Sequence, residues 1–286
     1  YTSKINHYNN IGIPLNIALV TTHEPGEFWS CLYESFDKVS CQKKIQLSIH
    51  SVKYLKSFIE KLKFLSHDNN GIILMVPDLN NDQYSQIKRK LGTFPIVSIA
   101  PSNQPLFHTV TFDSYMGGKL AAKNLIASGY TVFGHIAGPL SKPEANLRRA
   151  GFIDEIKKNS FDLKFEFEGD HSYESGRQAF KSLNINSFKN LGIFSSNDQM
   201  AMGFLSSAIE QNKFLLKSWG IIGYDNTPSS KIFHPKLSSI DTDLDQLASL
   251  SLEKLTTLVQ NPSKDESITT TLIPVSAVMR NTHHSK

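Results

Sequence analysis

The chain has 286 residues, of which 40% are hydrophobic and 20% are charged, and its net charge is +4 with the histidines neutral. This length is enough for one large or two medium domains with a substantial core. The basic excess is spread thinly, and the lack of a long basic run argues against a nucleic-acid-binding segment. Two cysteines, Cys31 and Cys41, are too few for a disulfide framework, and no apolar run is long enough to span a membrane. We therefore expect a protein of a reducing, cytoplasmic compartment.

Short β-branched and apolar runs alternate with amphipathic segments in the first part of the chain. This alternation predicts strand–helix units, in which crossover helices cover both faces of a parallel sheet. The expected strands are Leu15–Thr21, Lys44–Ile49, Gly71–Val76, Ile96–Ala100 and His108–Phe112, and the expected helices are Glu27–Ser40, Leu55–Ser66 and Gln83–Leu91.

The same alternation restarts after this first set and predicts a second α/β sheet. Gly129 follows the first helix of the new set, at the position that a left-handed C-cap requires. Two doubly wound sheets in succession fit the pattern better than one very large sheet. The expected helices are Met116–Ser128, Ala145–Lys158, Tyr173–Leu183, Gln199–Gln211 and Leu244–Gln260, and the expected strands are Val132–Ala137, Leu163–Phe167, Leu191–Ser195 and Trp219–Tyr224. A last extended segment, Thr269–Val275, is expected after the final helix.

Polar residues follow several of the expected strands. Open parallel sheets bind ligands beyond the carboxyl ends of their strands. If two such sheets face each other, we expect these residues to line one cleft. They are Thr21, Thr22 and His23 after the first strand, Gly138, Pro139 and Leu140 after Val132–Ala137, and the pairs Asn197–Asp198 and Asp225–Asn226 farther along the chain.

Three stretches are specific enough to compare with a known family. They are Asp113–Ala122 (DSYMGGKLAA), which leads on to Ala137-Gly-Pro-Leu; Phe194–Gly203 (FSSNDQMAMG); and Ile222–Pro228 (IGYDNTP), which is followed by HPKLSSI. In this order and with these gaps, they closely resemble the effector-binding domain of the lactose/galactose/purine repressor family. The resemblance extends from about Leu15 to Arg280.

The resemblance implies a fold of the type I periplasmic-binding-protein kind, with two doubly wound parallel-sheet lobes joined by three crossings. The N-terminal lobe would contain residues 15–112 and 244–271, and the C-terminal lobe residues 113–243 and 272–286. Residues 1–14 would be the remnant of a linker.

The resemblance also implies partners. Members of this family normally carry an N-terminal helix-turn-helix domain, so operator DNA would be bound by the parent protein, outside this chain. A homodimer is expected through first-lobe helices that include Phe58–Leu65 or Leu247–Leu258. The apolar stripes of these helices could equally belong to the core.

Three residues of the second lobe match ligand-binding positions of the family. Arg148 matches an arginine that grips the effector, and its planar guanidinium can hold two hydroxyls or a carboxylate at fixed angles; the alternative is a solvated helix arginine, as we expect for Arg149. Asp225 matches a ligand-binding aspartate, although it could instead cap its own loop. Asn197 matches the asparagine of sugar-binding members and favours a carbohydrate over a nucleobase. It could also cap the next helix, a role for which Asp198 is the better candidate.

Two aromatic residues and a histidine are candidates for stacking on the ligand. Phe28 and Trp29 open the first helix, where the purine-binding branch has two aromatics, and an aromatic face can stack on a sugar or a base. Core packing is the alternative for both, and we favour the ligand role more for Trp29 than for Phe28. His171 stands where relatives have Trp or Phe, and a neutral imidazole can still stack or donate one hydrogen bond.

The first lobe departs from the family pattern at Ala100, where many relatives have an acidic residue that reaches the ligand. Thr22 and His23 are candidate substitutes for it. Lys142 and Glu144 align with ligand-proximal positions and could recognise a charged substituent such as a phosphate, but a salt-bridged surface pair is the favoured alternative.

We find no motif for catalysis, for a metal or for a cofactor. Gly117-Gly-Lys superficially resembles a phosphate-binding loop but lacks its spaced glycines, and His283 and His284 lack a third ligand nearby. We therefore predict a non-enzymatic ligand-sensing domain of a repressor, which binds a small carbohydrate or sugar derivative in the cleft between the lobes. The alternative is the periplasmic sugar-binding protein of an ABC transporter, which the linker-like start of the chain disfavours.

Overall fold

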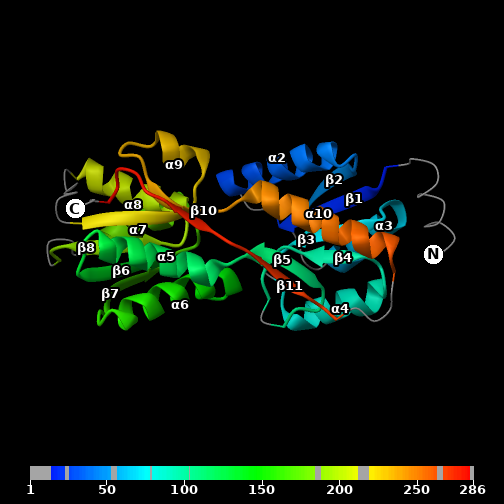
Figure 1. Cartoon of the computed structure of the whole chain (residues 1–286), viewed down its shortest axis with the longest axis horizontal. Helices are drawn as coiled ribbons and strands as arrows, with labels where there is room; N and C mark the ends of the chain where they lie inside the picture. The colour runs from blue at the N-terminus through cyan, green and yellow to red at the C-terminus, as the bar shows by residue number, and fades with distance from the viewer. Residues whose placement is uncertain are drawn as a thin grey trace. The chain divides into compact units, whose positions relative to one another are not determined.

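The computed structural model describes residues 14–22, 26–52, 57–77, 79–102, 104–183, 188–211, 219–262 and 267–283 (Figure 1). The chain divides into two compact units. Unit 1 comprises the described residues within Tyr1–Pro25, Trp29–Thr111 and Asp243–Ile273, and unit 2 those within Gly26–Phe28, Phe112–Thr242 and Pro274–Lys286.

Unit 1 contains a six-stranded sheet of order β11-β5-β4-β3-β1-β2. The strands from β2 to β5 are parallel to their neighbours, and Ile17 of β1 pairs with Leu47 of β2 on one side and with Gly71 of β3 on the other. The strands are β1 (Asn16–Thr22), β2 (Gln46–Val52), β3 (Gly71–Met75), β4 (Ile96–Ser98), β5 (His108–Phe112) and β11 (Thr270–Ile273), and the helices are α2 (Glu27–Gln42), α3 (Phe58–Asp68), α4 (Asn81–Leu91) and α10 (Leu244–Gln260).

The apolar stripes of α3 and α10 belong to the core of unit 1. Phe58 and Leu62 of α3 are at most 1% exposed, and Leu255 of α10 is fully buried. Helix α10 packs so closely on β3 that a Cβ on Gly71 would lie 2.9 Å from Leu255 Cγ. The structure therefore supports core packing, rather than a dimer surface, as the role of these two stripes. On α3, Phe64 is the large apolar side chain that stays exposed, at 67%.

Unit 2 contains a second six-stranded sheet, of order β12-β10-β9-β8-β6-β7. Its strands are parallel except β12, which runs antiparallel to β10. The strands are β6 (Val132–Ala137), β7 (Leu163–Glu168), β8 (Leu191–Ser195), β9 (Trp219–Asp225), β10 (Ser238–Asp241) and β12 (Ser276–Val278), and the helices are α5 (Ser114–Ala127), α6 (Pro143–Lys158), α7 (Tyr173–Ser182), α8 (Asp198–Glu210) and α9 (Pro228–Ile232).

Helices cover both faces of the unit 2 sheet. Ile193 and Ile221 pack in one core cluster with α7 and α8, whereas Phe194 and Ile222 pack in another with α5 and α6. Because successive strand residues point to opposite faces, these two helix pairs must lie on opposite sides of the sheet. The doubly wound α/β fold predicted from the sequence is therefore confirmed for each unit.

The predicted strands and helices are confirmed, with bounds that move by a few residues. Gly129 has the predicted left-handed conformation, with φ +84°, and its amide donates to Ile126 O at 2.9 Å, just after the end of α5. The last extended segment expected, Thr269–Val275, contains β11 of the unit 1 sheet. At Pro274 the chain passes into unit 2, where β12 follows.

Three short elements of unit 2 have no clear signal in the sequence, namely α9, β10 and β12. β10 (SSID) and β12 (SAV) are brief and rich in serine, so they lack the apolar run that identifies a strand. Pairing fixes them instead, because Ser238 of β10 pairs with Ile222 of β9, and Ile240 of β10 pairs with Ala277 of β12.

We predict that Leu255→Ala lowers the free energy of unfolding by about 2–5 kcal/mol, because it leaves a cavity between α10 and β3. Chemical denaturation measures the loss, and sedimentation reports the oligomeric state. Leu272→Ala is the matched control, because that leucine is 55% exposed and should change stability little. A Leu255→Ala protein of unchanged stability but altered oligomeric state would show that this stripe is an interface.

Candidate functional site

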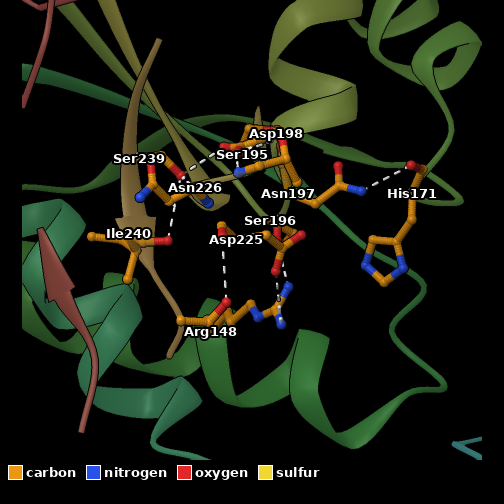
Figure 2. Close-up of polar contacts among 12 residues, drawn as sticks. Arg148, His171, Ser195, Ser196, Asn197, Asp198, Asp225, Asn226, Ser239 and Ile240 are labelled. Atoms are coloured by element: carbon orange, nitrogen blue, oxygen red, sulfur yellow. Dashed lines mark hydrogen bonds and ion pairs between the residues drawn. The ribbon is translucent and has the colours of Figure 1, made fainter. Parts of the chain in front are cut away.

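The candidate site lies at the carboxyl edge of the unit 2 sheet (Figure 2). His171 follows β7, Asn197 follows β8, Asp225 ends β9, and Arg148 comes from the middle of α6. Parallel strands place their carboxyl ends at one edge, which is why residues so far apart in the sequence meet there. The structure thus brings together the four ligand-binding residues predicted for this unit.

Arg148 is buried, at 9% exposure, but only partly paired. Its Nη1 donates to Ser196 O at 2.6 Å, and its Nη2 lies 3.9 Å from Asp225 Oδ1. The guanidinium carbon lies 3.6 Å from the centre of the Tyr224 ring, a cation–π contact. The Nε donor is buried without a hydrogen-bond partner among the described residues. This burial excludes the alternative of a solvated helix arginine.

The neighbouring Arg149 differs from Arg148 in both its exposure and its pairing. Its Nε and Nη2 donate to the two carboxylate oxygens of Glu166 at 2.6 and 2.8 Å, and both side chains are partly exposed. It is the surface arginine expected from the sequence, although it is paired rather than simply solvated. This pair of adjacent arginines supplies a natural control for experiments on the site.

Asp225 holds its carboxyl group close to Arg148 in an unusual backbone conformation. Its φ is 100°, in the left-handed region that residues other than glycine seldom adopt. Burial raises the pKa of Asp225 to about 7, although Arg148 opposes the rise, and Glu144 adds to it. In the described part of the chain the carboxylate accepts no hydrogen bond from a loop amide, so the structure does not support a loop-capping role.

Asn197 caps α8, which corrects the expectation that Asp198 would do so. Its side-chain oxygen accepts from Met200 N at 2.9 Å, and its Nδ2 donates to the backbone oxygen of His171 at 2.9 Å. The amide group therefore ties the loop after β7 to the start of α8 (Figure 2). Both the oxygen and the nitrogen of the Asn197 side chain therefore make a structural hydrogen bond, and the residue is 9% exposed.

Asp198 is a fully buried carboxyl group that the sequence analysis assigned only as a helix cap. It accepts hydrogen bonds from Thr227 N at 2.8 Å, Thr227 Oγ1 at 3.2 Å and Ser239 Oγ at 2.6 Å. Burial, and then the nearby charge of Asp225, raise its pKa to about 8 despite these bonds. Asp198 joins the loop after β9 to β10 and so fixes the segment that carries Asp225.

The ring of His171 packs against the backbone just after β6. A Cβ on Gly138 would lie 2.0 Å from His171 Nε2, and this nitrogen is buried with no hydrogen-bond partner in the described chain. Burial, with help from Arg148 and Lys142, lowers the pKa of His171 to about 3. The imidazole is therefore neutral at physiological pH, as the sequence analysis assumed.

The other predicted residues that the structure describes come from β1 and α2. Thr22 ends β1 in unit 1, and its buried Oγ1 has no partner among the described residues. Trp29, at 8% exposure, lies on the buried face of α2 with Leu32 and Phe36, whereas Phe28 is more exposed. The ligand role expected for these two aromatics stays a prediction.

The remaining motifs considered in the sequence lie in α5 or near the C-terminus. His23 and His284 lie outside the described residues. Gly117 and Gly118 lie within α5 and form no phosphate-binding loop. The described residues hold no cluster of three His, Cys, Asp or Glu side chains suited to a metal ion. None of the helices in the described ranges is long and apolar enough to cross a bilayer.

The chain matches known proteins over most of its length. A family model described as a periplasmic binding protein-like domain matches residues 122–283. The lactose operon repressor of Escherichia coli is 26% identical over 91% of this chain and 71% of its own length, and the HTH-type transcriptional repressor PurR of Mannheimia succiniciproducens is 30% identical over 70% of this chain and 60% of its own. The solved structure of a dimeric lac repressor with a C-terminal deletion has a TM-score of 0.84 and 25% identity, and covers 95% of this chain and 100% of that one.

The family match, the two α/β units and the repressor relatives all indicate the same protein family. The chain belongs to the periplasmic binding protein-like family, as an effector-binding domain of the lactose repressor type. The sequence resemblance is thereby confirmed.

We predict that Asp198→Asn flattens the pH dependence of stability. A carboxyl group whose pKa is raised on folding stays protonated in the native state while the unfolded chain loses its proton, so stability falls as pH rises from about 4 to about 8. Asparagine keeps an acceptor for Thr227 N and carries no charge. Melting temperatures across this range, for wild type and variant, check the prediction.

A residual fall in the variant is expected from Asp225, whose raised pKa acts in the same direction. Asp198→Ala should behave differently, because it leaves three buried donors on Thr227 and Ser239 without an acceptor and destabilises at every pH. If the melting temperatures of wild type and Asp198→Asn changed with pH in the same way, the raised pKa assigned to Asp198 would be contradicted.

Proposed function

We propose that this chain senses a small carbohydrate or sugar derivative for a transcriptional repressor, and that Arg148 and Asp225 of unit 2 hold the hydroxyl groups of that ligand. The observation that carries the proposal is the incomplete pairing of Arg148. A buried guanidinium with a free Nε donor and an ion pair of 3.9 Å is costly unless a further partner completes it.

The polar atoms around Arg148 suit hydroxyl groups. Asp225 supplies carboxylate acceptors, and Arg148 supplies donors. Ser196 Oγ and His171 Nε2 are also buried without hydrogen-bond partners in the described chain. A sugar hydroxyl donates one hydrogen bond and accepts others, so it can satisfy both kinds of group, and charge-assisted bonds of this sort contribute about 1.5–3 kcal/mol each.

The relatives favour a regulator over the alternative, a periplasmic carrier protein. Those named above are repressors, and the lac repressor structure among them is dimeric. We therefore infer that the parent protein is a cytoplasmic homodimer that regulates transcription, with operator DNA contacted outside this chain. In this role the domain binds its effector without catalysing a reaction.

A purine is the second candidate ligand, because PurR proteins are among the relatives. A planar base needs an aromatic stacking partner, whereas the position where relatives have Trp or Phe is occupied here by His171. The His171 ring packs against the backbone at Gly138, so it offers a poorer stacking surface than an indole. This favours the carbohydrate.

We predict that a thermal-shift screen finds stabilisation by a sugar or sugar phosphate and not by a nucleobase. The screen should contain ribose, galactose, lactose, cellobiose, hexose 6-phosphates, hypoxanthine and guanine. Arg148→Ala and Asp225→Ala should each abolish the shift, since each removes one side of the hydroxyl-binding group. Arg149→Ala should retain it, because that guanidinium is committed to Glu166. Stabilisation by hypoxanthine alone, or binding that survives in both site variants, would refute the carbohydrate proposal.

We further predict that sugar affinity rises with pH through about 7. A hydroxyl that donates to Asp225 favours the carboxylate form, so it binds better once the raised pKa of Asp225 has been passed. Isothermal titration calorimetry at pH 6, 7 and 8, in buffers of different ionisation enthalpy, should detect proton release on binding below pH 7.

Asp225→Asn should remove both the pH dependence and the proton release. Asp198→Asn tests the contribution of the other buried carboxyl group, whose pKa is also raised. Arg148 and Glu144 are the other charged groups that act on Asp225. An affinity that is flat in wild type, or that falls with pH, would contradict the ionised role of Asp225.

A further inference from the structure

Two adjacent glycines of α5, Gly117 and Gly118, lie against Tyr224 and the backbone of Arg148. A Cβ on Gly118 would lie 2.0 Å from the carbonyl oxygen of Arg148 and 2.8 Å from the amide nitrogen of Phe152. A Cβ on Gly117 would lie 2.5 Å from Cε2 of Tyr224. Real Cβ atoms are essentially never closer than 3.0 Å to another heavy atom, so a side chain at either position would force a neighbour to move.

The two glycine contacts act on different parts of Arg148, namely its backbone and its guanidinium group. Gly118 meets backbone atoms of α6, which cannot rotate away, and so sets where the Cα of Arg148 lies. Gly117 meets the ring of Tyr224, which is fully buried and lies 3.6 Å from the Arg148 guanidinium carbon. Glycine weakens a helix relative to alanine, yet α5 has two in succession at this point.

We propose that Gly117 and Gly118 are positioning residues for Arg148. Gly118 fixes the backbone of the arginine through the contact between α5 and α6. Gly117 provides the space for the Tyr224 ring that supports the guanidinium. The pair that resembles a phosphate-binding loop in the sequence therefore acts on the ligand-binding site through Arg148 and touches no ligand itself.

This inference rests on the proposed function only for the role of Arg148 in ligand binding. The position of the guanidinium can be measured without any ligand, so the experiment below uses none. Failure of the sugar screen would sink the proposed function and leave the positioning role intact, whereas failure of the following measurements would sink the positioning role alone.

The first measurement is the Nε–H resonance of Arg148 in a ¹⁵N-correlated NMR spectrum of the deuterated protein, identified by its loss in Arg148→Lys. Protons over an aromatic ring are shifted upfield, so the wild-type signal should be displaced from those of the exposed arginines. In Gly117→Ala, the Tyr224 ring must move and the signal should shift downfield. In Tyr224→Phe, the ring remains and the signal should stay near its wild-type position.

The second measurement is the pH titration of the Asp225 carboxyl carbon by ¹³C NMR. The charge of Arg148 lowers the pKa of Asp225, so a displaced guanidinium should move the titration midpoint above about 7. A role of the glycines in general helix packing would not produce this change.

Gly203→Ala is the matched control. A Cβ there would lie 1.9 Å from Tyr173 O in the contact between α7 and α8, which is as tight as that of Gly118 but remote from Arg148. It should lower the stability of unit 2 and leave both NMR signals unchanged. If Gly118→Ala fails to fold, Gly117→Ala decides the question, since it meets a side chain rather than backbone. A folded Gly117→Ala protein with wild-type signals, or equal changes in Gly203→Ala, would overturn the proposal.

Discussion

The Arg148 guanidinium lies between the ring of Tyr224 and the carboxylate of Asp225, and it is nine-tenths buried. A cation in this setting loses its hydration and regains only part of that free energy from one backbone carbonyl and a distant ion pair. The surroundings must therefore hold it in place by packing. Strand β9 supplies both neighbours, since Tyr224 and Asp225 are successive residues at its end, and α6 supplies the arginine.

The buried carboxyl groups of Asp198 and Asp225 have different roles in the site. Asp198 accepts three hydrogen bonds from Thr227 and Ser239, and these bonds join the loops after β8 and β9 to β10. Asn197, next to it, joins the loop after β7 to α8. These residues hold the loops, and Asp225 lies with Oδ1 3.9 Å from Arg148 Nη2.

The sequence predicts the strands and helices that carry this site better than it predicts the hydrogen bonds among the site residues. Alternating apolar runs locate the strands, and the parallel-sheet rule brings Asn197 and Asp225 to one edge. Arg148, in the middle of α6, is identified only by the family resemblance. The cap of α8 was expected from Asp198 and is formed by Asn197, because either residue type can cap a helix and the choice depends on the space beside them. That space is created by Gly223 on β9, where a Cβ would lie 2.2 Å from Asp198 Oδ1. No pattern within one segment reveals such a contact.

Four glycines of unit 2 lie at contacts between pairs of helices. Helices α7 and α8 meet through Gly176 and Gly203 in the way that α5 and α6 meet through Gly118 and Gly151, each glycine against a backbone carbonyl of the partner helix. Gly118 contacts the carbonyl of Arg148, and Gly176 that of Met200, whose amide is the one capped by Asn197. Contacts between backbones cannot be repacked by rotating a side chain. These close contacts between helices thus fix two parts of the site in unit 2. One is Arg148 on α6, and the other is the capped start of α8.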